Sequence, residues 1–337
     1  MADYHISCMP AEATHYLNLR PVGTYVDGTV GGAGHSRMIC TRIQPGGLLI
    51  GIDQDLDAIR HAREVLTPFA PRVSLHHDSF SHLDRIIHDL GLKGVDGILL
   101  DLGLSLHQLE GSGRGFSFKR EEPLDMRMNA EAKITAADVV NGWDVDDLMR
   151  IFREYGEERR ARSIAKAIAK ARARQPLESS KALADLIYRS MPPAAARKQK
   201  IHPATRVFQA LRITVNRELD RLQRTLPLAV GCLNPGGRLC VLSFHSLEDR
   251  IVKQTFREMA RTCTCPPRAP VCTCKGEAQV TLLTRKVVRP TAEEIAANPM
   301  ARSTCLLYTS PSPRDHLAHL VCRLLLEKRG GGGGGGG

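Results

Sequence analysis

The sequence predicts an α/β fold in which a parallel-type sheet is interrupted by a mostly helical insertion. Short apolar runs, such as 48–52 and 98–100, alternate with helix-like stretches in the first part of the chain. The strand signal stops after Gly103 and returns at 238–244, behind the turn Asn234-Pro-Gly-Gly237. Short buried strands separated by helices are typical of a parallel sheet that is covered on both faces.

The individual elements follow from the periodicity of apolar residues. The expected strands are 24–26, 48–52, 73–75, 98–100 and 238–244. The expected helices are 56–66 and, within the insertion, 145–153, 159–174, 181–191 and 203–233. We therefore expect one discontinuous domain, 1–104 with 234–303, and an inserted helical domain at 105–233.

The segment 304–337 fits neither domain. It has no clear periodicity, and its last eight residues are all glycine, a low-complexity run without side chains to bury. We interpret this tail as artefactual or disordered and assign it no function. If the tail is genuine, the sheet would lack its last strand.

Composition and charge narrow the class of protein. Charged residues make up 25% and apolar residues 42% of the chain, which is ordinary for globular domains. There are 47 Lys and Arg against 36 Asp and Glu, and the formal net charge of +11 favours a polyanionic partner. No apolar run approaches the length of a bilayer span, and the start does not resemble a signal peptide. We therefore expect a cytoplasmic protein without a membrane partner.

A glycine-rich turn follows the first expected strand. Gly28, Gly31, Gly32 and Gly34 lie between this strand and the next helix, where the backbone can approach a ligand closely. Asp53 ends the second strand 19 residues after Gly34, where a carboxylate typically accepts the ribose hydroxyls of an adenosine cofactor. A solvated carboxylate at the end of a strand is the alternative interpretation of Asp53.

Three further side chains narrow the cofactor. Asp27, at the tip of the first strand, could face the methionine ammonium of S-adenosylmethionine, but it would be an awkward neighbour for the pyrophosphate of NAD. Phe80, after the third strand, could flank an adenine ring or belong to the core. Asp101 ends the fourth strand and points into the crevice beyond the strand ends, where such sheets bind ligands.

Several motifs resemble the bacterial RsmH (MraW) family. Among them are Asp101-Leu-Gly-Leu-Ser105, Arg114-Gly-Phe-Ser-Phe118 and Pro123-Leu-Asp-Met-Arg-Met128. The resemblance covers about 5–303, and its other blocks are 27–36, 202–206, 208–213, 216–219 and 235–250. Two positions depart from the family pattern, because the chain reads His5-Ile-Ser-Cys-Met-Pro10 near its start and leaves the pattern after Ser303.

The resemblance implies a fold, an activity and a set of binding residues. The fold would be a class I Rossmann-like methyltransferase. The activity would be transfer of a methyl group from S-adenosylmethionine to the N4 amine of a cytidine in the decoding region of small-subunit (16S) ribosomal RNA. By position, the cofactor contacts would be Ala33, Gly34, His35, Asp53, Phe80, Asp101 and Gln108.

Methylation of an exocyclic amine needs positioning and a proton acceptor rather than a covalent intermediate. We expect Asp101, with the backbone around Leu102 and Gly103, to orient the amine. His245, after the strand 238–244, is a second catalytic candidate, with an ordinary strand-end histidine as the alternative. No cysteine lies between the fourth strand and the next helix, which excludes the covalent route of carbon-5 methyltransferases.

The insertion offers a surface for the RNA. The helix 159–174 would carry basic residues on one face, and a solvated charged face is the alternative to phosphate contact. These residues are Arg159, Arg162, Lys166, Lys170 and Arg174. A second basic cluster lies at 197–203.

Four cysteines form a compact set, and the chain has ten in all. Cys263, Cys265, Cys272 and Cys274 could bind a structural zinc ion, although their C-x-C spacing departs from the usual ligand pairs. Reduced thiols in a surface loop are the alternative. We expect no metal in the active site.

Two other function classes stay open at this stage. A nucleotide-dependent oxidoreductase is favoured only by the glycine turn, and a non-catalytic RNA-binding protein of ribosome assembly would not need Asp27, Asp53 and Asp101. The sequence points to ribosomal RNA or a ribosomal subunit as partner. It leaves a homodimer open as well.

Overall fold

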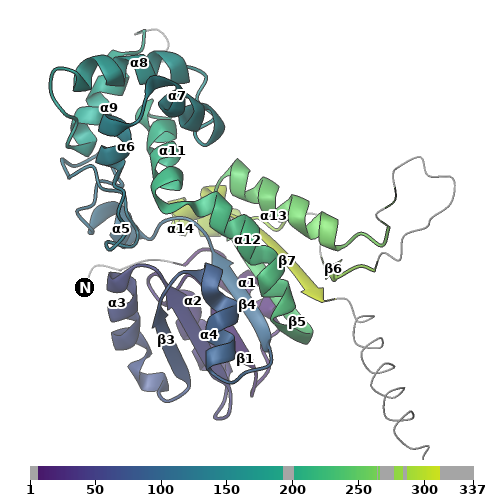
Figure 1. The fold of residues 1–337 in the computed structure, drawn as a ribbon. Coiled ribbons are helices and arrows are strands. Elements are labelled where there is room, and N and C mark those ends of the chain that lie inside the picture. Colours follow the sequence, from purple (N-terminus) through teal and green to yellow (C-terminus); the bar gives the residue numbers. More distant parts are fainter. Residues whose placement is uncertain (1–6, 193–200, 264, 266–276, 284–286, 312–337) are drawn as a thin grey trace, which may run out of the picture.

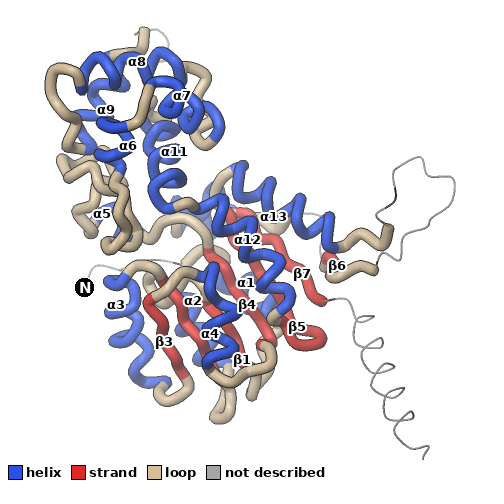
Figure 2. The backbone as a smooth tube through the Cα atoms, in the orientation of Figure 1, coloured by secondary structure: helices blue, strands red, loops and turns tan. Residues whose placement is uncertain are grey.

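The computed structural model describes residues 7–192, 201–263, 265, 277–283 and 287–311. Within these ranges, seven strands form one sheet in the order β3-β2-β1-β4-β5-β7-β6. Strands β1 to β5 pair in parallel, whereas β7 is antiparallel to both β5 and β6 (Figure 2). The strands are β1 Thr24–Asp27, β2 Leu48–Asp53, β3 Val73–His77, β4 Val95–Asp101, β5 Leu233–Ser243, β6 Val280–Leu282 and β7 Cys305–Pro311. The expected α/β class is confirmed.

Helices cover both faces of the sheet (Figure 1). The two-residue alternation of a strand sends Val26 and Ile50 into a core with α4, α12 and α13, and it sends Tyr25 and Leu49 into a core with α1, α2 and α3. These helices are α1 Pro10–Leu17, α2 Gly34–Arg42, α3 Leu56–Leu66, α4 Leu83–Asp89, α12 Glu218–Gly231 and α13 Ser246–Met259. In the described ranges, no helix is long and apolar enough to cross a membrane.

The insertion is a helical body with a core of its own, and it lies beyond the carboxyl ends of the parallel strands (Figure 1). The helices expected at 145–153, 159–174 and 181–191 correspond to α7, α8 and α9. Thr135, Asp144 and Ser179 begin α6, α7 and α9 by accepting a hydrogen bond from a backbone N–H. The helices from α5 to α11 described here are α5 Leu106–Glu110, α6 Ala136–Gly142, α7 Val145–Glu154, α8 Ala161–Arg172, α9 Ser180–Arg189 and α11 Ala204–Asn216.

The boundary expected at residue 233 is wrong, because the helix expected at 203–233 is two helices. Arg217 adopts a left-handed conformation, with φ 52° and ψ 39°, and separates α11 from α12. The two helices belong to different cores: Leu211 on α11 packs in the insertion, whereas Leu222 and Leu226 on α12 pack on the sheet. The insertion therefore ends near Asn216.

The expectation for the tail is also wrong for its first residues. Cys305–Pro311 form β7, which lies between β5 and β6 in the sheet. Leu306 is fully buried, and the ring of Tyr308 stacks on Tyr16 with centroids 3.9 Å apart. The α/β domain thus extends to about Pro311 and has its last strand. Between β6 and β7 lie α14 Ala292–Ala297 and a short 3₁₀ helix, Pro299–Ser303. Residues 312–337 lie outside the described ranges.

Candidate active site

A cavity opens at the carboxyl ends of the parallel strands, below the insertion. It encloses about 1010 Å³ of empty space, including its open mouth. Its walls come from the glycine turn after β1, from the loops after β2 to β5, and from residues at the base of the insertion. Five of the seven expected cofactor contacts line it: His35, Asp53, Phe80, Asp101 and Gln108. Open α/β sheets bind their ligands at this edge.

Ala33 and Gly34 are not among the lining residues, but they shape the turn. Ala33 is buried and left-handed, with φ 61°, and it begins α2. A Cβ on Gly34 would lie 2.1 Å from Ser7 Oγ, and one on Gly28 would lie 2.6 Å from a methyl carbon of Leu100. A side chain at either position would force Ser7, Leu100 or the turn itself to shift.

Asp27 does not take the role that the sequence suggested. Its side chain is fully buried and does not line the cavity. One carboxylate oxygen accepts a hydrogen bond from Ser36 Oγ at 2.6 Å, and the other accepts one from the Thr29 backbone N–H at 3.2 Å. Asp27 thus fixes the turn to the first part of α2 instead of facing a ligand ammonium.

Asp53 lies at the end of β2 with both oxygens engaged by backbone groups. They accept hydrogen bonds from the N–H groups of Gly31 and Asp55, each at 2.8 Å. Burial raises the pKa of Asp53 to about 7, although these two hydrogen bonds act in the opposite direction. A carboxylate oxygen has a second lone pair, so Asp53 can still accept hydroxyl groups from a ligand in the cavity.

His35 connects Asp101 to the segment before α1. Its Nε2 lies 2.9 Å from the Cys8 carbonyl oxygen, and its Nδ1 lies 3.3 Å from Asp101 Oδ2. Burial lowers the pKa of His35, but the nearby Asp101 and Asp27 carboxylates outweigh it, so the pKa lies above its usual value. The other oxygen, Asp101 Oδ1, is buried and has no hydrogen-bond partner among the described residues.

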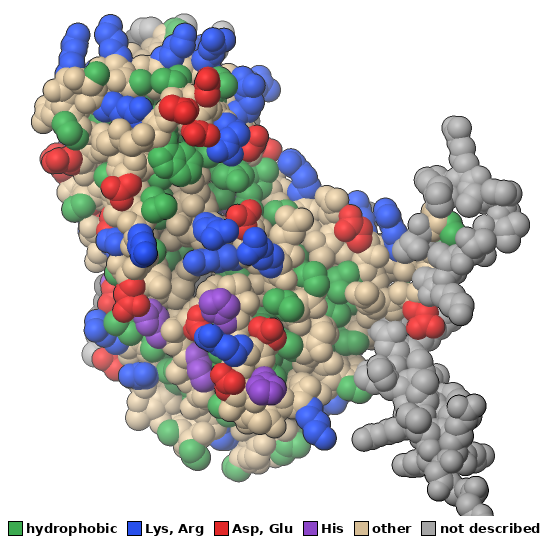
Figure 3. Space-filling view, in the orientation of Figure 1, with side chains coloured by type: hydrophobic (Ala, Val, Ile, Leu, Met, Phe, Trp, Pro, Cys, Tyr) green, Lys and Arg blue, Asp and Glu red, His purple; other side chains and the backbone are tan. Residues whose placement is uncertain are grey.

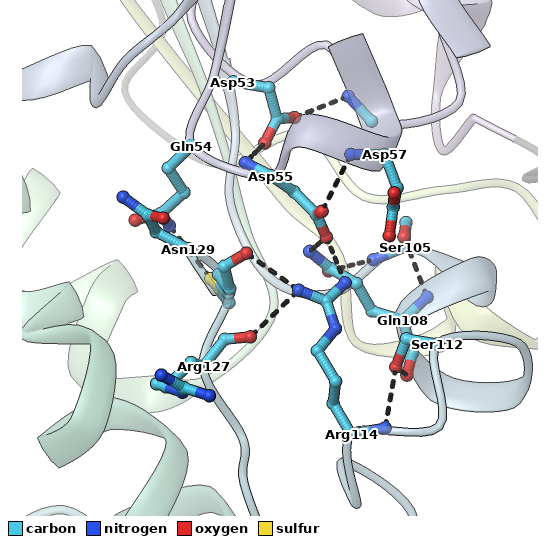
Figure 4. Close-up of polar contacts among 12 residues, drawn as sticks. Asp53, Gln54, Asp55, Asp57, Ser105, Gln108, Ser112, Arg114, Arg127 and Asn129 are labelled. Atoms are coloured by element: carbon cyan, nitrogen blue, oxygen red, sulfur yellow. Dashed lines mark hydrogen bonds and ion pairs between the residues drawn. The ribbon is translucent and has the colours of Figure 1, made fainter. Parts of the chain in front are cut away.

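Gln108 holds the cavity wall together through Asp55, a residue that the sequence interpretation missed (Figure 4). The Gln108 side chain donates to Asp55 Oδ2 at 3.0 Å, while Ser105 and Gln108 form a capping box at the start of α5. Arg114 forms a buried ion pair with the same Asp55. The capping pattern was readable in the sequence, but no local signal joins Asp55 to Arg114.

The motif 123–128 forms part of the cavity wall. Arg114 donates to the carbonyl oxygens of Arg127 at 3.0 Å and Met128 at 2.9 Å (Figure 4). From the other side, Asn216 accepts a hydrogen bond from the Met128 N–H and donates one to the Met126 carbonyl, each at 2.8 Å. Met128 and Asn216 line the cavity, so these motifs meet at one place.

His245 does not line the cavity, but its partner Glu248 does. His245 begins α13, and its Nε2 lies 3.2 Å from Glu248 Oε1. Burial by itself raises the pKa of Glu248, but His245 and Arg212 outweigh it and hold the pKa below its usual value. Glu218 lies within metal-ligand reach of both residues, yet it is already in a two-bond ion pair with Arg212 at 2.9 and 2.8 Å. We therefore assign no metal to this cluster.

Two expectations fall partly outside the described residues. Cys263 and Cys265 are described, but Cys272 and Cys274 are not, so the four-cysteine zinc site stays a prediction. The second basic cluster also falls mostly on residues outside the described ranges.

The basic face of α8 has the expected orientation. Ile164 and Ile168 are buried in the insertion core, and five basic residues on and beside the helix are exposed: Arg159, Arg162, Lys166, Lys170 and Arg174. Figure 3 shows Lys and Arg side chains gathered over this end of the insertion.

The MraW methylase family model matches residues 2–310. The chain belongs to the MraW methylase family. A relative from Desulforapulum autotrophicum, named Ribosomal RNA small subunit methyltransferase H, is 53% identical over 302 residues, which are 90% of this chain and 97% of the relative. Relatives of the same name from Syntrophotalea carbinolica and Geobacter sulfurreducens are 52% and 51% identical, over 90% and 91% of this chain and 96% and 98% of their own lengths.

Solved structures resemble this MraW-family chain only distantly. One is an rRNA methylase from Streptococcus thermophilus, with a TM-score of 0.39 and 9% identity over 90% of this chain and 91% of that one. The family assignment therefore rests on the sequence matches. Neither the oxidoreductase nor the non-catalytic assembly protein, both left open by the sequence, gains support from these relatives.

Proposed function

We propose that this chain transfers the methyl group of S-adenosylmethionine to the N4 amine of a cytidine in the decoding region of 16S ribosomal RNA. The observation that carries the proposal is the buried Asp101 Oδ1, which has no partner among the described residues and belongs to a side chain that lines the cavity. An acceptor left open in a cavity at the strand ends suits an amine that must be oriented and then lose a proton. The family assignment and the names of the relatives support the same activity.

The cavity fits S-adenosylmethionine by its donors and acceptors. Asp53 offers acceptors for the ribose hydroxyls, and Phe80 offers a ring beside the adenine. Gly28 and Gly31 line the wall, where their backbone can approach the ligand without a side chain in the way. When bound, S-adenosylmethionine supplies a methyl group made electrophilic by its sulfonium.

In the proposed reaction the protein forms no covalent bond to either substrate. The N4 nitrogen would attack the methyl carbon as the bond from carbon to sulfur breaks, the electron pair would stay on sulfur, and the amine proton would pass to Asp101 Oδ1. In our proposal Asp101 Oδ1 accepts a hydrogen bond from the amine and orients its lone pair. His35 pairs with the other oxygen of Asp101, and that ion pair holds the carboxylate in place.

His245 stays the second candidate, and we assign it a positioning role. Its ring lies beside Glu248, and Glu248 accepts a hydrogen bond from the Phe244 N–H at 2.9 Å. Phe244 and Glu248 both line the cavity. His245 would thus fix the loop after β5 against the incoming base.

The substrate side of the proposal involves the insertion. The exposed basic residues of α8 suit the phosphates of ribosomal RNA, either free or within a small subunit. The cytoplasmic location, the zinc site and the homodimer stay predictions.

The test is to incubate the protein with labelled S-adenosylmethionine and small ribosomal subunits that lack the modification, and then to map the methyl group. We expect one labelled cytidine in the decoding region, with the label on N4. Label on carbon 5 or on another base would contradict the proposal. Binding to the subunit without transfer would instead favour a non-catalytic assembly protein.

A further inference from the structure

A second pocket lies on the insertion side of the junction between α11 and α12. It encloses about 770 Å³, including its open mouth, and none of its lining residues belongs to the first cavity. Its walls come from α7, from the end of α11 and from the start of α12. Its lining includes Ile134, Trp143, Arg150, Tyr155, Arg217 and Asp220.

The chemistry of this pocket combines aromatic rings with cationic groups. Trp143 and Tyr155 are partly buried, so each ring has one part packed in the insertion core and another part open to the pocket. The Arg150 side chain is 49% exposed, and that of Arg217 is 62% exposed. Ile134 exposes 49% of its surface and adds an apolar side chain to the pocket wall.

Aromatic faces next to arginine suit an unstacked nucleobase better than a lipid or an apolar peptide. Every base has a π face that stacks on tryptophan or tyrosine, and its phosphates pair with guanidinium groups. Both cations have acidic neighbours, since Arg217 lies 3.8 Å from Asp220 and Arg150 lies 2.9 Å from Asp147, but both side chains stay exposed to solvent. The pocket thus offers cations at its rim and rings within.

The second pocket and the proposed active site share one segment of chain as a wall. The short segment 216–222 contributes to both, because Asn216, Glu218 and Arg221 line the first cavity while Arg217 and Leu219 line the second. Arg217 precedes α12 in a left-handed conformation and lines the second pocket, whereas Arg221 lies on α12, lines the first cavity and donates to Gln54 Oε1. Figure 3 shows Lys and Arg side chains gathered where the insertion meets the α/β domain.

We propose that the second pocket holds an unpaired base of the same RNA strand, near the target cytidine, while Arg217 and Arg221 contact the phosphates between the two bases. The inference rests on the proposed function, because it needs an RNA substrate in the first cavity. It adds a second recognition point, which selects an RNA strand with two accessible bases rather than a single free nucleoside.

The chain provides its own probe, because Trp143 is its one tryptophan. A base stacked on this ring quenches its fluorescence. We expect a short single-stranded RNA with the decoding-region sequence to quench the emission in a saturable way, and S-adenosylmethionine alone to leave it unchanged. Saturable RNA binding without any change in emission would overturn the proposal.

A pair of variants separates this proposal from the proposed function. Trp143→Leu and Tyr155→Leu keep apolar volume but remove the ring, and we expect the KM for RNA to rise roughly tenfold with kcat and S-adenosylmethionine affinity unchanged. Tyr188→Leu, at an exposed tyrosine on α9, is the matched control and keeps the wild-type KM. Wild-type protein that methylates RNA, with ring variants that keep its KM, would overturn the second pocket alone. Absence of methyl transfer by the wild type would overturn the proposed function.

Discussion

Asp101 is the side chain whose substitution bears most directly on the chemistry. One of its oxygens pairs with His35, and the other is buried without a partner among the described residues. Asp101→Asn keeps the shape but removes the charge that attracts the amine proton. We expect kcat to fall roughly 10²- to 10⁴-fold, the usual contribution of a general base, while the Kd for S-adenosylmethionine changes less than about tenfold.

The matched control for this substitution lies on the same strand. Asp96 is near the start of β4 and accepts a hydrogen bond from the Thr24 N–H, far along the strand from the cavity. Asp96→Asn should therefore keep the wild-type kcat. Full turnover by Asp101→Asn, measured by methyl incorporation at saturating substrate, would remove Asp101 from the reaction.

The raised pKa of Asp53 predicts that the stability of the protein depends on pH. Burial raises its pKa to about 7, whereas the unfolded chain releases this proton near pH 4. Between these values the folded protein binds more protons than the unfolded chain, so the stability contributed by Asp53 is lost as pH rises from about 4 to 7. Asp53→Asn removes this dependence. We expect the difference between the two Tm values, variant minus wild type, to increase from pH 5 to pH 8 in the absence of cofactor.

Cofactor binding should show the opposite trend. The ionised carboxylate is the better acceptor of ribose hydroxyls, so the affinity of the wild type for S-adenosylmethionine should increase from pH 6 to pH 8. Calorimetric titration of Asp53→Asn should give a weaker affinity that varies less over this range. An equally steep pH profile in the variant would assign the effect to another group.

Individual residues differ in how far the sequence could locate them. Asp53, Phe80 and Asp101 follow predicted strands, and the sheet geometry alone brings the ends of those strands together. Asp55 and Arg114 could not be paired in this way, because their ion pair joins the α/β domain to the insertion across 59 positions of the chain. Only the packing of the two bodies determines it.

At the scale of elements, the sequence predicted helices better than their ends. Helical periodicity continues without interruption through position 217. Glycine and proline usually mark a break in a helix, but the residue at this position is arginine. The break arises because α11 packs in one core and α12 in another, and the chain must change direction between them. A left-handed residue makes this turn at a cost of roughly 1–2 kcal/mol.

Strand β7 escaped prediction for a related reason. Its residues contact β5 and β6 across the sheet, and such a pairing leaves no periodic signal in a segment of seven residues. Its apolar side chains nevertheless enter both cores: Leu306 packs with α1 and α2, and Leu307 packs with α12 and α13. Strand β7 also lies outside the alternation of strands and helices that identified the parallel strands.

The burial of β7 predicts a stability effect. Leu306 is fully buried, so Leu306→Ala should lower the free energy of unfolding by roughly 2–5 kcal/mol, because apolar surface is no longer removed from water and a cavity is left behind. Leu282→Ala, on the neighbouring β6 where the side chain is 38% exposed, is the matched control and should cost less than about 1 kcal/mol. Urea unfolding measures both. Equal, small effects would show that β7 does not pack in solution as described.

The whole molecule consists of two bodies with separate cores that meet around the cavity. Asp55 with Arg114, and Glu157 with Ser246 and Arg250, connect them through polar contacts. The discontinuous arrangement was predictable because strand signals stop and later return. The position of the cavity under the insertion was not, because it depends on how the two bodies are oriented.

The chain has a formal net charge of +11, and part of its excess of basic residues lies on the exposed face of α8. The role of this face in RNA binding can be tested. If the exposed face of α8 binds phosphates, removing one basic side chain should reduce the steepness of the salt dependence of RNA binding by roughly 0.7 in a plot of log K against log salt concentration. Lys166→Gln with Lys170→Gln should therefore flatten this slope by about 1.4 and leave methylation at saturating RNA unchanged. Arg60→Gln, at an exposed residue on α3 of the other body, should leave the slope unchanged. A double variant with the wild-type slope would show that α8 is a solvated face, and the phosphates would then have to be bound by α12 and the junction.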